Sequence, residues 1–380
     1  MSKIVIDLGL VKEPINFSFG LKTYINKKKG FSFVVIGKKK DVSLVDGIDG
    51  VQTIAIDKNI DDYASLTDAL AEDASSFAVA VKLLKDWDAD DLLLIDYDQR
   101  TVDALGVVLK RLEFLETPVM CGFIATRLKP VVVADYGYVK DPTFADLTEF
   151  YDLALLTAKT INEPKKFVSQ KARLIPSFKK DDEVVEGIIA MLDLDVEYGY
   201  PWAQDLYRLL QESKRQDFFG TISLEKLFLG ESIDALVTCG DTGRVISEAA
   251  WGYNKAFLAL INSDSSRAPM AGLGLSWARK TIAATKRSMD NESLSKSKLL
   301  LGFEKPVVLA TTDSTYAVSN ALNIALATAS KNLQGAIYAN YRKYAPAPVP
   351  APTADQVLLD TVARFKKINE DLVRNAGIKK

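Results

Sequence analysis

The sequence predicts an α/β fold with a mixed or parallel sheet core, flanking helices, a helical insertion and extended N- and C-terminal arms. Short apolar runs bounded by turn residues alternate with segments of helical periodicity, which is the pattern of strand–helix–strand units. The chain has 380 residues, of which 48% are hydrophobic, so it can bury a large core. The run DLLLIDYD (91–98) has the continuous apolar stretch expected of a strand that is covered on both faces.

The first 30 residues are expected to form an N-terminal arm. Two short strand-like pieces, KIVIDLGL and INFSFG, flank the turn-like VKEP. The segment 1–20 is too short to be an independent domain. We therefore expect Ile4, Val5 and Ile6 to add a strand to the sheet of a neighbouring copy, which would pair their backbone groups.

Residues 31–160 are expected to form the first part of the α/β core. Strands are predicted at 31–37, 51–56, 91–98, 118–125 and 129–137, and helices at 61–87, 101–115 and 143–160. The segment KGFSFVVI (29–36) is close to a ribonucleoprotein signature. That signature requires a strand, a helix and a strand before it, and the preceding residues show no helical period. Nucleic acid is therefore not an expected partner.

Residues 161–230 are interpreted as a helical insertion, because a polar, basic stretch with two prolines precedes two helical patterns, at 181–193 and 202–216. The second part of the core is expected at 231–344. Its predicted strands are 232–240, 255–262 and 305–312, and its predicted helices are 243–252, 265–287 and 313–333.

The C-terminal segment 345–380 is expected to be a proline-rich linker followed by an amphipathic helix. APAPVPAP (345–352) is typical of a semi-rigid polyproline spacer. The apolar stripe of the helix is formed by Leu358, Val362, Phe365 and Leu372. A short helix cannot bury such a stripe alone, so it docks on its own chain or on a neighbouring copy.

Composition argues against most catalytic chemistry. The chain contains no histidine, which excludes Ser–His and Cys–His nucleophile systems and His-bearing metal sites. The two cysteines, Cys121 and Cys239, lie in apolar runs and are expected to be buried free thiols. No apolar run approaches about 20 residues, so no membrane span is expected. We therefore expect a protein that is not an enzyme and has no cofactor or metal.

One pair of carboxylates keeps an enzymatic alternative open. Asp96 and Asp98 follow an apolar strand, an arrangement that resembles the start of haloacid-dehalogenase-type phosphotransferases. That alternative is a carboxylate- and magnesium-dependent α/β enzyme that handles phosphate. In the other interpretation, Asp98 caps the following helix. The loop VTCGDTGR (237–244) also offers backbone amides to an anion, although close packing is the simpler explanation.

Charge is distributed unevenly along the chain. Residues 1–40 carry nine lysines and two acids, whereas residues 41–98 carry fifteen acids and three lysines. The basic segment includes two triplets, Lys27, Lys28 and Lys29, and Lys38, Lys39 and Lys40. The opposite blocks can meet within one subunit, or between copies that self-associate.

The layout resembles the sheath subunits of contractile phage tails. The resemblance is carried by residues 61–98, a helix leading into an apolar strand, and by residues 253–287, a strand leading into a small-residue helix. It implies a structural subunit in the virion tail, assembled in the host cytoplasm. Its partners would be further copies in a helical assembly, an inner tail tube and baseplate proteins. Another self-assembling viral scaffold is a further alternative.

Overall fold

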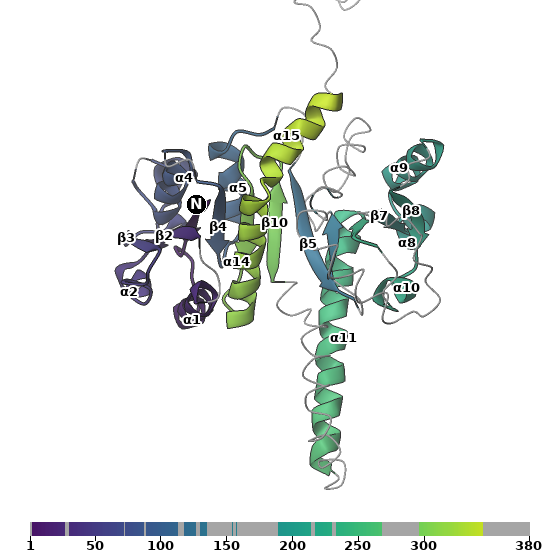
Figure 1. The fold of residues 1–380 in the computed structure, drawn as a ribbon, viewed down its shortest axis with the longest axis horizontal. Coiled ribbons are helices and arrows are strands. Elements are labelled where there is room, and N and C mark those ends of the chain that lie inside the picture. The colour runs from purple at the N-terminus through teal and green to yellow at the C-terminus, as the bar shows by residue number, and fades with distance from the viewer. Residues whose placement is uncertain are drawn as a thin grey trace, which may run out of the picture. The chain divides into compact units, whose positions relative to one another are not determined.

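The computed structural model describes residues 2–26, 30–71, 73–86, 89–112, 118–126, 130–134, 154, 157, 189–213, 217–229, 233–267 and 296–344. The chain has an α/β fold in which helices cover both faces of one large mixed sheet (Figure 1). It forms two compact units, Met1–Ile337 and Tyr338–Lys380, and the sheet belongs to the first.

Eleven strands form the sheet, in the order β3-β2-β1-β4-β11-β10-β5-β6-β9-β7-β8. Their bounds are β1 Ser2–Asp7, β2 Phe31–Gly37, β3 Val51–Ala55, β4 Asp91–Ile95, β5 Val119–Ala125, β6 Pro130–Ala134, β7 Ile189–Leu192, β8 Phe218–Ile222, β9 Ala235–Val237, β10 Ser297–Leu301 and β11 Val307–Ala310.

The sheet consists of two parallel halves that run in opposite directions. Strands β3, β2, β1, β4 and β11 are parallel to one another, as are β6, β9, β7 and β8. Between them, β10 and β5 make three successive antiparallel pairings, which reverse the strand direction. The carboxyl ends of the two halves therefore lie at opposite edges of the sheet.

The helices of this unit and their bounds are α1 Pro14–Ile25, α2 Lys39–Val42, η1 Ile60–Asp62, α3 Leu66–Ala69, α4 Ser76–Asp86, α5 Gln99–Val108, α8 Asp193–Tyr198, α9 Pro201–Glu212, α10 Leu224–Leu229, α11 Gly240–Arg267 and α14 Thr315–Ser330. The last helix described, α15 (Leu333–Tyr344), starts in this unit and ends in the second. None of the helices described is both long enough and apolar enough to cross a bilayer.

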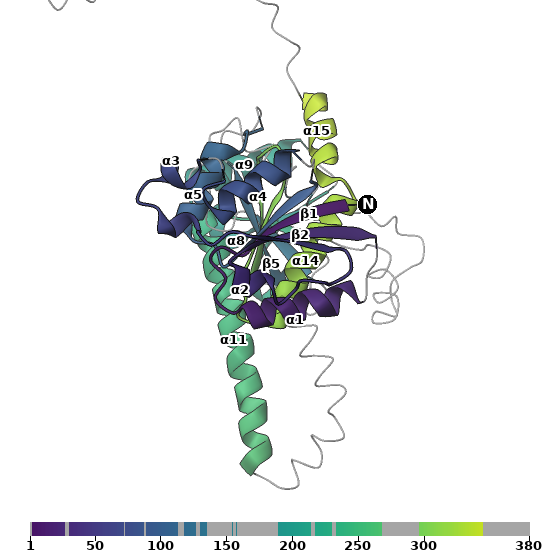
Figure 2. The same ribbon diagram turned by 90° about the vertical axis from the view of Figure 1, so that its left-hand side faces the viewer.

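The two faces of the sheet carry separate layers of helices, and β1 shows why. Ile4 and Ile6 point to the face covered by α1, α2, α9 and α14, whereas Val5 points to the face covered by α4 and α5. Figure 2 shows α1 and α4 on opposite sides of β1 and β2. Helices α10 and α11 add a third apolar cluster with β5, β6 and β9. Burial on both faces explains the continuous apolar runs of the central strands.

The segment expected to be an N-terminal arm lies in the middle of the sheet. Ile4, Val5 and Ile6 are fully buried, and β1 pairs with β2 on one side and β4 on the other. No backbone edge of β1 is therefore left for a neighbouring copy. INFSFG (15–20) is helical rather than extended, because Pro14 starts α1 and the side chains of Phe17, Leu21 and Tyr24 share its buried side.

Two further segments differ from the predictions. The described part of the expected helical insertion contains strands β7 and β8, which extend the main sheet. KAFLALIN (255–262), predicted to be a strand, lies within the 28-residue helix α11. Both segments are short apolar runs, which periodicity alone cannot assign to strand or helix. The C-terminal stripe Leu358, Val362, Phe365 and Leu372 lies outside the described residues.

Close packing of α1 on α14 depends on Gly20, and this leads to a test. A Cβ at Gly20 would lie 2.8 Å from both Cβ and Cγ1 of Val318. We expect Gly20→Ala to destabilise the fold by about 1–3 kcal/mol, because the helices must move apart. Gly252→Ala in α11 is the control, since nothing lies within 4 Å of its added Cβ. It should be neutral or stabilise by up to about 1 kcal/mol in urea unfolding. Equal effects at both positions would contradict this account of the packing.

Candidate functional site

The topology of the first half of the sheet indicates where a site is expected. From β1 the chain moves through α1 to β2 and β3, and then returns to place β4 on the other side of β1. The loops that follow β1 and β4 therefore leave in opposite directions. In open α/β sheets, ligands bind at the carboxyl ends of strands at such a switch point.

Asp96 holds three loops together at this point. The carboxylate is buried and accepts hydrogen bonds from the backbone N–H of Lys12, at 2.8 Å, and of Thr312, at 2.9 Å. The Thr312 hydroxyl is a further donor to it. These donors follow β1 and β11, and Asp96 follows β4. We call this set, Asp96 with Lys12 and Thr312, the Asp96 clamp.

The Asp96 clamp also has an unusual backbone and fixes the start of α1. Asp96 has a φ of 53°, in the left-handed region that few non-glycine residues adopt. The Thr312 hydroxyl accepts the backbone N–H of Glu13 at 3.0 Å, and Asn16 Nδ2 donates to the Thr312 carbonyl at 2.9 Å. The clamp thus positions α1 against the loop between β11 and α14.

A second buried carboxylate, Asp7, shapes the loop after β1. Its Oδ1 accepts the backbone N–H of Gly9 at 3.0 Å, and Asn59 Nδ2 donates to the Gly9 carbonyl at 3.0 Å. A Cβ at Gly9 would collide with the Ser76 hydroxyl and crowd Asn59, so glycine allows this close approach. Burial raises the pKa of Asp7 to about 6, and the Ser76 hydroxyl and the Gly9 N–H partly offset this rise.

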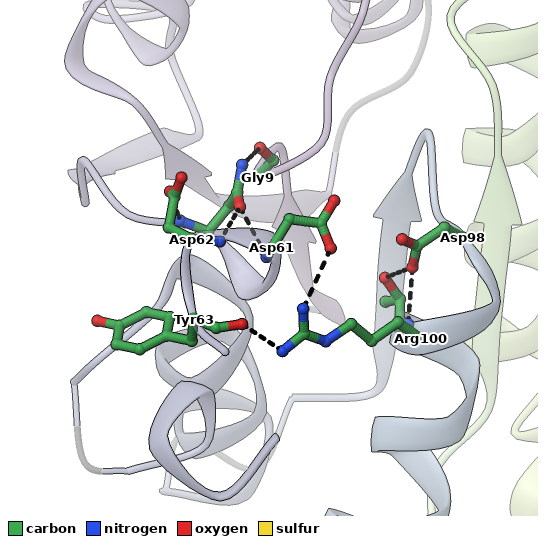
Figure 3. Close-up of polar contacts among 8 residues, drawn as sticks. Gly9, Asp61, Asp62, Tyr63, Asp98 and Arg100 are labelled. Atoms are coloured by element: carbon green, nitrogen blue, oxygen red, sulfur yellow. Dashed lines mark hydrogen bonds and ion pairs between the residues drawn. The ribbon is translucent and has the colours of Figure 1, made fainter. Parts of the chain in front are cut away.

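Figure 3 shows the polar contacts that continue from Gly9 to the start of α5. Asn59 caps the short helix η1, accepting the backbone N–H of Asp61 at 2.8 Å. The Asp61 carboxylate lies 4.0 Å from the Arg100 guanidinium, which also donates to the Tyr63 carbonyl. Desolvation, followed by the nearby charge of Asp98, raises the pKa of Asp61, while Arg100 opposes the rise.

The second half of the sheet has its own buried carboxylate, at the opposite edge. Asp195 follows β7 and reaches the start of α11, which follows β9. Its carboxylate accepts hydrogen bonds from the Thr242 hydroxyl at 2.8 Å and from the Cys239 backbone N–H at 3.2 Å. The Thr238 hydroxyl also donates to it. In the loop VTCGDTGR (237–244), considered above as an anion site, the Cys239 amide thus donates to a carboxylate of the chain itself.

The two predicted site residues, Asp96 and Asp98, make different hydrogen bonds in the structure. Asp96 and Asp98 both lie at the switch point, but both oxygens of Asp96 accept hydrogen bonds from the loops. Asp98 caps α5 through the backbone N–H of Thr101, as one interpretation predicted. Among the residues that the structure describes, no group of three or more side chains is placed to hold a metal ion.

The described basic triplet, Lys38 to Lys40, directly follows the carboxyl end of β2, which is parallel to β1 and lies on the side of β1 away from β4. Lys38 precedes α2, and Lys39 and Lys40 are exposed within it. Lys27, Lys28 and Lys29 lie outside the described residues. Cys121 and Cys239 are buried free thiols, which confirms that prediction.

Sequence reasoning missed Asp7, Lys12 and Thr312 as members of the site. The signal was present in part, because IVID (4–7) repeats the pattern of LLLID (92–96), an apolar strand that ends in aspartate. Recognising that β1 and β4 are parallel neighbours would have placed both aspartates at one edge.

Comparison with known proteins finds similarity to bacterial phosphate acyltransferases. A phosphate acyltransferase from Sulfurimonas denitrificans is 22% identical over 348 residues, which cover 89% of this chain and 96% of the relative. One from Sulfurovum sp. is 23% identical over 279 residues, covering 72% and 78%. No family model matches the chain.

A solved structure shares the fold. The crystal structure of a branched-chain phosphotransacylase from Enterococcus faecalis V583 matches with a TM-score of 0.50 and 14% identity, covering 87% of this chain and 99% of the other. This match confirms the α/β architecture predicted from the sequence.

These findings overturn the functional expectations drawn from the sequence. The relatives are bacterial enzymes, so the resemblance to a tail sheath is wrong, as are the virion location, the helical assembly and the tube and baseplate partners. The expectation that the chain is not an enzyme is also wrong. The misleading segments, 61–98 and 253–287, were helix-to-strand and strand-to-helix patterns that many α/β proteins share. The described start of the second segment is helical.

The Asp96 clamp can be tested with a matched pair of variants. We expect Asp96→Asn to lower the free energy of unfolding by about 2 kcal/mol or more, because an amide replaces a charged acceptor of several hydrogen bonds. Asparagine tolerates the left-handed backbone, so strain does not confound the change. Asp98→Asn should change stability by less than about 0.5 kcal/mol, since asparagine is an equally good helix cap. Urea unfolding measures both, and similar losses would refute the clamp.

The raised pKa of Asp7 predicts a pH-dependent stability. The folded state holds the Asp7 proton more tightly than the unfolded chain, so stability falls as the pH rises from about 4 to about 6. Asp7→Asn removes this dependence and should gain about 2 kcal/mol relative to wild type between pH 4.5 and pH 8. Urea unfolding across this range measures the difference. Asp91, whose pKa burial also raises, contributes equally to both proteins. Parallel pH profiles would contradict the assignment.

Proposed function

We propose that this chain catalyses the transfer of an acyl group between a thioester donor and inorganic phosphate, as a phosphotransacylase does. The observation that carries the proposal is the similarity to a phosphate acyltransferase over 348 residues, which cover 96% of that relative. A match of this length includes both halves of the sheet, so it concerns the whole architecture and not one motif.

The chemistry fits a chain without histidine. A phosphate oxygen attacks the carbonyl carbon of the thioester, the carbon–sulfur bond breaks, and the thiolate leaves and takes up a proton. The product is an acyl phosphate, a mixed anhydride, which is why the donor must be activated. Because phosphate is already ionised at neutral pH, the nucleophile needs no Ser–His or Cys–His pair to generate it.

The carboxyl edge of β1, β4 and β11 supplies the groups that this reaction needs. Lys12 is exposed on a loop that Asp96 holds in place, and it provides a cation near the edge. Helix α14 starts at the same edge, where Ser314 caps it by accepting the backbone N–H of Ala317 at 3.1 Å. The start of a helix of 16 residues favours an anion through its N–H groups and its dipole.

The proposal predicts phosphate-dependent thioester cleavage by the full chain. Acetyl, isobutyryl and octanoyl thioesters of N-acetylcysteamine are mixed with the protein and inorganic phosphate. A thiol reagent follows the release of the carrier, and phosphorus NMR of a parallel reaction measures the acyl phosphate. We expect one acyl phosphate for each thiol released and no release without phosphate.

The control separates this activity from simple hydrolysis. Thiol release that does not depend on phosphate would identify a thioesterase and overturn the proposal. So would a lack of turnover with all three acyl chains by protein that is folded by circular dichroism.

A further inference from the structure

Next to the Asp96 clamp, Lys296 and Asp313 form an ion pair to which the proposed reaction assigns no role. Lys296 lies at the start of β10, which is paired there with the end of β11 through Ser297 and Ala310. Its Nζ is 2.7 Å from Oδ2 of Asp313, in the loop that carries Thr312. The two side chains are 31% and 49% exposed, so the pair is open to solvent.

Asp313 is surrounded by donors and positive charge. Besides Lys296, the Thr311 hydroxyl donates to the same Oδ2 at 3.1 Å. Lys296 and the charge of Lys12 contribute to a lowered pKa of Asp313. Lys12 belongs to the loop after β1, so cations from two separate strand ends act on this one carboxylate.

Aromatic side chains hold further lysines nearby. The Nζ of Lys296 lies 5.5 Å from the centre of the Trp251 ring, and that of Lys255 lies 5.1 Å from it. Lys298, on β10, lies over the Tyr97 ring at 5.8 Å. These contacts fix the positions of long, otherwise mobile side chains. Lys296 and Lys12 therefore act on Asp313 directly, and Trp251 holds Lys296 where it meets this carboxylate.

We propose that Asp313 occupies the phosphate subsite, and that inorganic phosphate binds Lys296, Lys12 and the Thr311 hydroxyl by displacing its carboxylate. The proposal rests on the proposed function for the identity of the anion. An exposed ion pair contributes only about 0–1 kcal/mol, so the displacement costs little. A phosphate dianion brings more charge and more acceptor oxygens to the same donors than a carboxylate does.

If the Asp313 carboxylate competes with phosphate, substitutions of Asp313 and Lys296 should change the dissociation constant for phosphate in opposite directions. Asp313→Asn removes the competing charge and should lower the dissociation constant for inorganic phosphate by about three- to fivefold, which corresponds to an exposed ion pair. Lys296→Gln removes a ligand and should raise that constant by about tenfold or more. Misfolding cannot tighten phosphate binding, so the result expected of Asp313→Asn cannot be an artefact of a damaged fold.

The experiment is a titration of the full chain with inorganic phosphate in a calorimeter at constant ionic strength. Tryptophan fluorescence gives a second readout, because Lys296 contacts the Trp251 ring, and Trp251→Phe should abolish that signal but not the heat. Asp73→Asn and Lys82→Gln are the matched controls, since this exposed pair, at 3.4 Å, undergoes the same charge changes elsewhere. Both controls should leave the dissociation constant within twofold of wild type.

The outcomes separate the subsite from the proposed function. Unchanged or weaker phosphate binding by Asp313→Asn, or shifts of equal size in the Asp73 and Lys82 controls, would overturn the subsite. Acyl transfer with a normal KM for phosphate in Lys296→Gln would overturn the subsite and leave the proposed function standing. Phosphate binding that follows the two variants, in a protein without acyl transfer, would support the subsite and reject the proposed reaction.

Discussion

The site at the carboxyl edge of the first sheet half depends on one buried carboxylate. Asp96 is surrounded by protein, and a charge in such a position is costly unless hydrogen bonds replace its water. Those bonds come from the loops after β1 and β11, so satisfying the charge also fixes the two loops. The left-handed backbone at Asp96 is kept because this network outweighs its strain. Lys12 and Asp313 owe their neighbouring positions to this arrangement.

A buried carboxylate also links two strand ends in the second half of the sheet. Asp195 reaches from the end of β7 to the start of α11 and accepts the hydroxyl of Thr242 and the amide of Cys239. Here the carboxylate is buried and uses the donors itself. At the first edge Asp313, which pairs with Lys296, is half exposed, and in the proposed subsite phosphate displaces it. The carboxylates Asp195 and Asp313 therefore differ in their access to solvent.

The uneven distribution of charge along the chain led to a wrong expectation about binding partners. The lysines counted in the first 40 residues include Lys12, which the fold places near Lys296, almost three hundred residues away in sequence. The acids of residues 41–98 include Asp91 and Asp96, which are buried and belong to the core and the clamp. A count of charged residues in a segment cannot distinguish an exposed charge from one that is buried and hydrogen-bonded. The count therefore gave too much weight to contacts between copies.

The sequence by itself determined the α/β class, most strands of the first half of the sheet, the buried free thiols and the cap at Asp98. These features depend on local patterns, such as apolar runs for buried strands and a side-chain acceptor before a helix. Only the tertiary structure decided that Ile4 to Ile6 form a central strand, that β7 and β8 extend the sheet, and that Lys12, Asp96 and Thr312 meet. Strand order and pairing are set by burial over the whole chain, which no local pattern records. The absence of histidine led to the expectation that the chain is not an enzyme, which the comparisons overturn, because composition does not record a nucleophile that a substrate brings.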